Sequence, residues 1–267
     1  MGILNVTPDS FAERSALGEP AEAVERALQI EAHGADLIDI GGESTRPGAV
    51  PVPASEELER VLPVLRALAG RLRIPISIDT YKAEVARAAL SEGAMLVNDV
   101  SGLRYDPALA GVVASAGAGL ILMHMRGRSS RMYQAAEYED VIGEVTRELG
   151  ESLAAAQLAG VPIDRLIVDP GIGFAKHAAH SYGVLARLAE VSEALDRPLL
   201  SGPSRKSFMR AALQDRPPLE RDWGTAAAVT ASILGGAHIV RVHAVSEMVQ
   251  VVRVAEEVRR HGSPAAH

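Results

Sequence analysis

The sequence predicts a (β/α)8 barrel: a single domain over residues 1–267 with a parallel core of eight strands. Three observations support this fold class. Eight short apolar segments recur along the chain, helical patterns separate them, and no linker interrupts the alternation. Segments that are apolar almost throughout are typical of parallel strands covered on both faces. An open, doubly wound sheet of eight strands is the alternative architecture for this pattern.

The expected strands are short and rich in Val, Leu and Ile. They are expected at residues 2–6, 37–40, 74–78, 95–97, 120–123, 166–168, 198–200 and 239–242. The first strand stops at Thr7-Pro8, because proline fixes φ and removes a hydrogen-bond donor. Asn5 interrupts this strand at a position where a buried strand is expected to be apolar.

Helical patterns lie between the expected strands. In the second of them Leu58, Val61 and Leu65 share one face, and Ser55 is expected to be the N-cap. A Gly-Ala pair stands between a helical pattern and the next strand at residues 34–35, 93–94, 117–118 and 236–237. Glycine at such a position can take the left-handed conformation that ends a helix, so the pairs form a weak internal repeat.

Composition limits the class of protein. Hydrophobic residues make up 48% of the 267 residues but aromatic residues only 3%, so the core is expected to consist of Val, Leu, Ile and Ala. The net charge is −7 with both signs mixed, which argues against a nucleic-acid partner. The absence of cysteine excludes disulfides and thiolate chemistry. With no signal-like N-terminus and no apolar run of membrane-spanning length, a soluble cytoplasmic protein without a membrane partner is expected.

A polar or charged side chain follows every expected strand. The carboxyl ends of barrel strands are where active sites form. In chain order they carry Asn5, Asp39, Asp79, Asn98 with Asp99, His124, Asp169, the segment 201–207, and Arg241 with His243. Any one of these could be a satisfied core residue. Burying all of them without partners would cost about 1–3 kcal/mol each, so their place on one rim predicts an active site.

These rim residues fall into two groups by chemistry. The first supplies donors, cations and one amide oxygen suited to a hard cation, and consists of Asn5, Thr45, Arg46, Arg241 and His243. Loops after strands 7 and 8 often hold phosphate in barrels, and the loop after strand 7 contains Arg205 and Lys206. This group predicts a phosphate or pyrophosphate site, with Mg²⁺ as a bridging ion.

The second group matches the edge of a flat heterocycle. It offers both acceptors and donors and consists of Asp79, Asn98, Asp169 and Lys206. The alternative is that the carboxylates and the lysine only pair with one another. No His/Glu cluster has the spacing of zinc ligands, and no Gly-x-Ser-x-Gly motif is present.

The ordered motifs resemble those of the dihydropteroate synthase family. They are Asn5-Val-Thr-Pro-Asp-Ser-Phe11, Asp39-Ile-Gly-Gly-Glu-Ser-Thr-Arg-Pro-Gly48, Ile78-Asp-Thr80, Asn98-Asp-Val-Ser-Gly102, Met123-His-Met-Arg-Gly127, Asp169-Pro-Gly-Ile-Gly-Phe174, Ser204-Arg-Lys-Ser207 and Arg241-Val-His243. They run from residue 5 to residue 243. The segments 45–48 and 204–207 are the most specific, whereas Asp169-Pro-Gly is shared more widely among pterin-binding barrels.

The resemblance implies a transferase of folate biosynthesis and a set of site residues. It implies the joining of 6-hydroxymethyl-7,8-dihydropterin diphosphate to 4-aminobenzoate with release of pyrophosphate, in a homodimer that uses Mg²⁺. Asn5 matches a position that helps to bind Mg²⁺ and diphosphate, and the other diphosphate positions are Thr45, Arg241 and His243. The pterin positions are Asp79, Asn98, Asp169 and Lys206. The positions around aminobenzoate, where sulfonamides compete, are Phe11, Arg46, Pro47, Phe174 and Ser207.

The implied mechanism needs no nucleophile from the protein. Early loss of pyrophosphate leaves positive charge on the pterin methylene, the carboxylates stabilise it, and the aromatic amine attacks. The residues expected to take part are Asn5, Asp79, Asp169, Lys206, Arg241 and His243.

The chain departs from the family pattern at three places. The first motif continues as Ala12-Glu13-Arg14-Ser15 where a Ser-Asp-Gly-Gly sequence is common. Residues 175–181 are also looser than the common version, and family members usually carry a segment before the first strand, which here begins at residue 2. A pterin-binding paralogue without turnover and a corrinoid-linked methyltransferase are the alternative functions; a methyltransferase has no need of the diphosphate group of residues.

Overall fold

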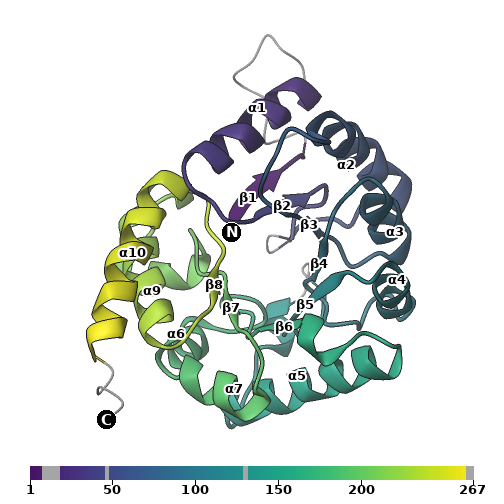
Figure 1. The fold of residues 1–267 in the computed structure, drawn as a ribbon. Helices are drawn as coiled ribbons and strands as arrows, with labels where there is room; N and C mark the ends of the chain where they lie inside the picture. Colours follow the sequence, from purple (N-terminus) through teal and green to yellow (C-terminus); the bar gives the residue numbers. More distant parts are fainter. Residues whose placement is uncertain (8–18, 46–47, 129–131, 263–267) are drawn as a thin grey trace.

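The protein forms a closed ring of parallel strands surrounded by helices (Figure 1). The computed structural model describes residues 1–7, 19–45, 48–128 and 132–262. Strands β1 (Gly2–Asn5), β2 (Ile38–Gly41), β3 (Ile76–Asp79), β4 (Leu96–Asp99), β5 (Gly119–Met123) and β6 (Leu166–Asp169) pair in sequence order, and β7 (Leu200–Ser201) pairs with β8 (Ile239–Val240).

Two isolated parallel bridges close the ring. Gly2 pairs with Val242 between β1 and the end of β8, and Val168 pairs with Leu199 between β6 and the start of β7. Backbone hydrogen bonds of 3.0 Å from Ile3 to Val242 and from Val168 to Pro198 accompany them. Every strand therefore has a neighbour on each side, which confirms the predicted (β/α)8 barrel over the open sheet.

Helices form the outer layer, as Figure 1 shows. They are α1 (Glu19–Ala32), α2 (Ala54–Leu68), α3 (Ala83–Ser91), α4 (Leu109–Ala116), α5 (Val141–Leu158), α6 (Ala178–Ala186), α7 (Leu188–Leu195), the short α8 (Arg210–Leu213), α9 (Asp222–Leu234) and α10 (Val245–Gly262). No helix within the described ranges is both long and apolar enough to cross a membrane.

Some predicted boundaries were wrong for local reasons. Strand β3 begins after Pro75 rather than at Ile74, and β7 begins at Leu200 rather than at Pro198, because proline has no N–H for the strand ladder. Ser55 lies inside α2, whose N-cap is Pro53 without a side-chain cap. The helix expected around residues 184–188 is divided at Arg187, where φ is −121° and ψ is 28°, into α6 and α7.

The four glycines of the Gly-Ala repeat all have left-handed backbone, with φ between 63° and 101°. The prediction from the repeat is therefore confirmed. Aliphatic side chains fill the core, also as expected. One buried cluster, formed by Met1, Leu37, Ile121 and Leu200, collects side chains from opposite sides of the ring and so fills its interior.

Candidate active site

The carboxyl ends of the first four strands place polar residues side by side. The strand register pairs Asn5 with Gly41, Gly41 with Asp79, and Asp79 with Asn98. A Cβ added at Gly41 would lie 3.3 Å from the Cβ of Asp79. The glycine therefore leaves room for the aspartate, and the strand ladder alone fixes the order of these side chains around the rim.

Arg241 joins two buried aspartates at this rim. Its Nε donates to Oδ2 of Asp39 at 2.6 Å, and its Nη2 donates to Oδ2 of Asp79 at 2.7 Å. Nδ2 of Asn98 donates to the same oxygen of Asp39 at 2.9 Å, which leaves Oδ1 of Asn98 as an acceptor. We call Asp39, Asp79, Asn98 and Arg241 the mouth cluster. It brings together residues that the sequence had assigned to separate groups.

The mouth cluster carries more negative than positive charge. Two carboxylates share one guanidinium, and Oδ1 of Asp39 is buried with no hydrogen-bond partner. Burial raises the pKa of Asp79 to about 7, against the opposing effect of Arg241. Burial lowers the pKa of Arg241, but the carboxylates of Asp39 and Asp79 outweigh this and hold it above its ordinary value. The cluster is therefore suited to receive a further donor or a cation.

Asp169, which is buried, and Lys206, which is partly buried, form a second group beside the mouth cluster. Oδ1 of Asp169 accepts the backbone N–H of Gly171 at 2.7 Å, and burial raises the pKa of this carboxyl. The ammonium of Lys206 donates to the carbonyl of Ile172 at 2.6 Å and lies 4.2 Å from the ring centroid of Phe174. Burial lowers the pKa of Lys206 to about 8, opposed by Asp169.

Gly202 lies where the two groups meet. A Cβ at this position would be 3.8 Å from the Cβ of Arg241, 3.8 Å from Nζ of Lys206 and 3.9 Å from Oδ2 of Asp169. A larger residue would project among these three side chains. The glycine after β7 therefore keeps the two halves of the site open to each other.

A cavity of about 280 Å³ is lined in part by Ser207, one of the expected aminobenzoate positions. Among its lining residues are Tyr133, His177, Ser207 and Arg210. The hydroxyls of Tyr133 and Ser207 are 2.9 Å apart, and the rings of Tyr133 and His177 are stacked with centroids 6.0 Å apart. Ser207 thus lies at this cavity, while Phe174 lies under Lys206 at the pterin side.

The residues expected to hold diphosphate do not all lie in the mouth cluster, which contains Arg241. Nδ1 of His243 lies 2.9 Å from Oγ of Ser204, which ties the end of β8 to the loop after β7. Arg205 makes a bidentate ion pair with Asp222 of α9 at 2.7 Å, so its guanidinium is already engaged. Asn5 and Thr45 are both partly buried. Phe11, Arg46 and Pro47 lie outside the described residues.

Sequence reasoning missed two features. Asp39 was recognised as a strand end but was given no role; the signal was a carboxylate inside the apolar stretch 37–40. The second feature is a buried ion network behind the rim, which connects His124, Glu148 and Lys176. His124 was noticed as a strand end, whereas no local pattern marks Lys176 as buried.

The Pterin binding enzyme family matches residues 1–243, which include every rim residue described above. The chain belongs to this family. Dihydropteroate synthase from Synechocystis is 47% identical over 260 residues, covering 97% of this chain and 90% of the relative. Among the similar solved structures, the two described next each have a TM-score of 0.91. Dihydropteroate synthase from Clostridium difficile with pteroic acid is 41% identical, covering 97% of this chain and 96% of the other. The Xanthomonas albilineans enzyme with 4-aminobenzoic acid is 42% identical, covering 99% and 93%.

Proposed function

We infer that this protein is a transferase that condenses 6-hydroxymethyl-7,8-dihydropterin diphosphate with 4-aminobenzoate, giving 7,8-dihydropteroate and pyrophosphate in folate biosynthesis. The observation that carries this conclusion is the match to dihydropteroate synthase over nearly the full length of both chains, at 47% identity. The carboxylates and buried ammonium at the barrel mouth are the chemistry that such a reaction requires.

We propose that the pterin ring binds between Asp79, Asn98, Asp169 and Lys206. Its amino and ring N–H groups meet carboxylate oxygens and the free Oδ1 of Asn98, whose amide is oriented by its bond to Asp39. The ammonium of Lys206 donates to the ring carbonyl. Because these groups are buried, each hydrogen bond to the ligand discriminates strongly against rings that lack the matching atom.

The bond-breaking step follows from the charge of the mouth cluster. The C–O bond between the pterin methylene and the diphosphate breaks, and its electron pair leaves with pyrophosphate. The methylene carbon becomes positive, and the carboxylates of Asp79 and Asp169 stabilise it in a site poor in water. The amine lone pair of aminobenzoate then forms the C–N bond, and one amine proton passes to solvent. Arg241 and His243 stabilise the departing diphosphate.

The proposed Mg²⁺ site fits a donor set completed by the substrate. Among the described residues no group of three or more His, Cys, Asp and Glu side chains could hold a metal ion. Mg²⁺ commonly takes one or two protein oxygens together with water and substrate phosphates. The side-chain amide oxygen of Asn5, at the end of β1, suits this arrangement. When bound there, the ion would supply charge to the leaving diphosphate; Thr45 would donate to the same group.

The aminobenzoate is proposed to lie between Phe174 and Ser207, next to the cavity of about 280 Å³. Phe11, Arg46 and Pro47 complete this part of the proposal by resemblance alone. A homodimer in the cytoplasm is proposed on the same basis. Light scattering coupled to size-exclusion chromatography measures the mass of the particle, and a mass of one chain would contradict the dimer.

The activity is tested directly with purified protein. The pterin diphosphate, Mg²⁺ and 4-aminobenzoate are incubated with it, and dihydropteroate and pyrophosphate are measured in equal amounts over time. Removal of Mg²⁺ with a chelator is expected to stop both. Pterin binding without product would indicate a non-catalytic paralogue instead of a synthase. Methyl transfer to a corrinoid without pyrophosphate release would indicate a methyltransferase.

A further inference from the structure

The chain uses lysine at only three of its 27 basic positions, at residues 82, 176 and 206. Lys176 is among the largest fully buried side chains, with 1% of its surface exposed. Lysine differs from arginine in having a compact ammonium whose pKa changes readily on burial. A buried lysine in a chain that otherwise prefers arginine therefore calls for an explanation.

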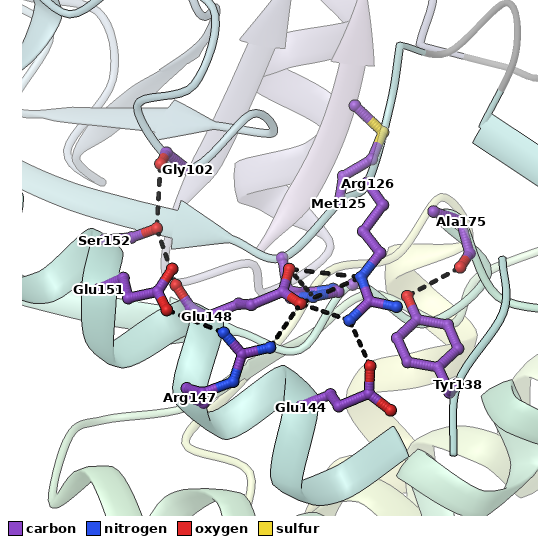
Figure 2. Close-up of polar contacts among 12 residues, drawn as sticks. Gly102, Met125, Arg126, Tyr138, Glu144, Arg147, Glu148, Glu151, Ser152 and Ala175 are labelled. Carbon is purple, nitrogen blue, oxygen red and sulfur yellow. Dashed lines mark hydrogen bonds and ion pairs between the residues drawn. The ribbon is translucent and has the colours of Figure 1, made fainter. Parts of the chain in front are cut away.

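Lys176 donates to three acceptors, as many as an ammonium has protons. Its Nζ lies 2.8 Å from Nδ1 of His124, 3.3 Å from the carbonyl of Gly171 and 3.2 Å from the carbonyl of Phe174. The two carbonyls belong to the loop that follows β6. Tyr138, just before α5, binds the same loop, since its hydroxyl donates to the carbonyl of Ala175 at 2.9 Å (Figure 2).

His124 connects Lys176 to Glu148 through a hydrogen bond at each of its ring nitrogens. Burial lowers the pKa of His124 to about 4, so its ring is neutral. Because Nδ1 accepts from Lys176, Nε2 carries the proton and donates to Oε2 of Glu148 at 3.2 Å. Figure 2 shows Glu148 of α5 in contact with the guanidiniums of Arg126 and Arg147. We call His124, Glu148, Lys176 and their arginines, which include Arg104, the rear cluster.

The loop after β6 is contacted by both Lys176 and Lys206. Lys176 binds the carbonyls of Gly171 and Phe174. The ammonium of Lys206 binds the carbonyl of Ile172 and lies over the ring of Phe174. Gly171 has φ of +68°, and a Cβ there would lie 1.9 Å from the carbonyl oxygen of His124, so the loop is held tightly against β5.

The two lysines also share Asp169. Burial lowers the pKa of each, to about 7 for Lys176 and about 8 for Lys206, and the carboxylate of Asp169 opposes the shift in both. The charged or titratable groups around Lys176 are His124 at the end of β5, Arg126 after it, Tyr138, Glu148 of α5, Asp169 of β6 and Lys206.

We propose that Lys176 is a positioning residue for the pterin site, acting on Lys206 through the loop after β6 and through their common neighbour Asp169. The inference rests on the proposed function, in which Lys206 touches the pterin ring. Lys176 is also among the residues that line the cavity of about 280 Å³ with Ser207, but in the proposed complex it is Lys206 that contacts the pterin ring. Lys176 sets the place of the Lys206 ammonium by fixing two carbonyls of the loop, and it affects the proton affinity of Lys206 by competing for the same carboxylate.

The test compares Lys176→Met with a matched surface variant, Arg187→Met, whose side chain is exposed and paired with Glu190. Lys176→Met is expected to lose about tenfold or more in kcat/KM for the pterin diphosphate, since small displacements of a binding group are costly. The surface variant is expected to match the wild type. Protein labelled with carbon-13 at the lysine ε carbon gives three signals, assigned with Lys82→Arg and Lys206→Arg, and their titration reports each lysine directly.

The titration separates positioning from a merely structural role. In Lys176→Met the signal of Lys206 is expected to titrate at higher pH than in the wild type, because its competitor for Asp169 is gone. An unchanged Lys206 titration, with or without a fall in kcat/KM, would overturn the proposal. Absence of dihydropteroate from the wild type would refute the proposed function instead, and the titration would still decide the coupling.

A second variant covers the case in which Lys176→Met does not fold. Glu148→Gln keeps an acceptor for His124 but removes a charge that favours the ammonium of Lys176. Lys176 is then expected to titrate at lower pH, and Lys206 to titrate at higher pH, because Lys176 loses its charge earlier and no longer competes for Asp169. A shifted Lys176 titration with an unchanged Lys206 titration would contradict the inference.

Discussion

The mouth cluster and the rear cluster are both built around buried carboxylates, but these carboxylates have different numbers of cationic partners. In the mouth cluster two carboxylates, Asp39 and Asp79, share one arginine. In the rear cluster one carboxylate, Glu148, is contacted by Arg104, Arg126, Arg147 and the ring of His124. Burial raises the pKa of Asp79 to about 7. Although burial acts in the same direction on Glu148, hydrogen bonds from its partners hold its pKa well below the usual range.

The difference distinguishes a site that still has an unpaired polar atom for a ligand from a network whose central carboxylate is fully paired. The mouth cluster retains a buried carboxylate oxygen without a partner, Oδ1 of Asp39. Such an arrangement costs stability and is explained by a ligand that brings donors or positive charge. Glu148, by contrast, is contacted by three arginines, two of which it shares with Glu144 and Glu151. It links α5 to the end of β5 and, through His124 and Lys176, to the loop after β6.

The largest effect is expected for Arg241→Met. The variant removes the cation proposed to stabilise departing diphosphate, and turnover is expected to fall by about a hundredfold to a thousandfold. Pterin affinity is expected to change much less, because the ring is proposed to bind other residues than Arg241. The comparison is made at a pH below about 8, where the ammonium of Lys206 is retained. Steady-state kinetics and calorimetric binding of a pterin without the diphosphate measure the two quantities.

Equal losses in turnover and in pterin affinity for Arg241→Met would show that Arg241 serves mainly as the counter-ion of Asp39 and Asp79. The distinction between a diphosphate group and a pterin group of residues would then be wrong.

The next effect is on stability and has opposite signs in the two clusters. Asp79→Asn removes a buried charge that has no full counter-ion, and a gain of about 1–2 kcal/mol in the free energy of unfolding at pH 8 is expected. Glu148→Gln removes a well-paired charge, and a loss of about 1–3 kcal/mol is expected at the same pH. Urea unfolding monitored by circular dichroism measures both.

The effects of Asp79→Asn and Glu148→Gln on the free energy of unfolding are also expected to depend differently on pH. The folded pKa of Asp79 is raised, so the stability of the wild type falls as pH rises from about 4 to about 7, and the advantage of Asp79→Asn grows over that window. The folded pKa of Glu148 is lowered, so its contribution is present above about 4.5 and is lost as pH falls below. A stabilised Glu148→Gln protein at pH 8 would refute the contrast.

The smallest effect is expected for Asp39→Asn. This change keeps an acceptor for Arg241 but removes one carboxylate and the firm orientation of the Asn98 amide. Turnover is expected to fall by about tenfold, the size of a single hydrogen bond to a charged group. Unaltered kinetics, measured under the same steady-state conditions, would show that Asp39 serves only the packing of the strand.

The sequence by itself determined the barrel and the place of its active site. Strand length, continuous apolar character and the Gly-Ala repeat are local properties, and they follow directly from how parallel strands are covered and how helices end. The polar strand ends were equally visible. The errors were also local, as at Pro75 and Pro198, where a missing N–H delays the pairing of an apolar segment.

Only the tertiary structure decided which charges meet. Arg241 lies 202 residues from Asp39 in sequence, and Lys176 lies 52 residues from His124. Whether a lysine is exposed or fully buried, and whether a carboxylate has one cation or three, depends on the closure of the barrel, since pKa and pairing follow from burial and neighbours rather than from residue type. The barrel brings these distant residues within hydrogen-bond distance, and so separates a mouth prepared for a ligand from the complete network behind it.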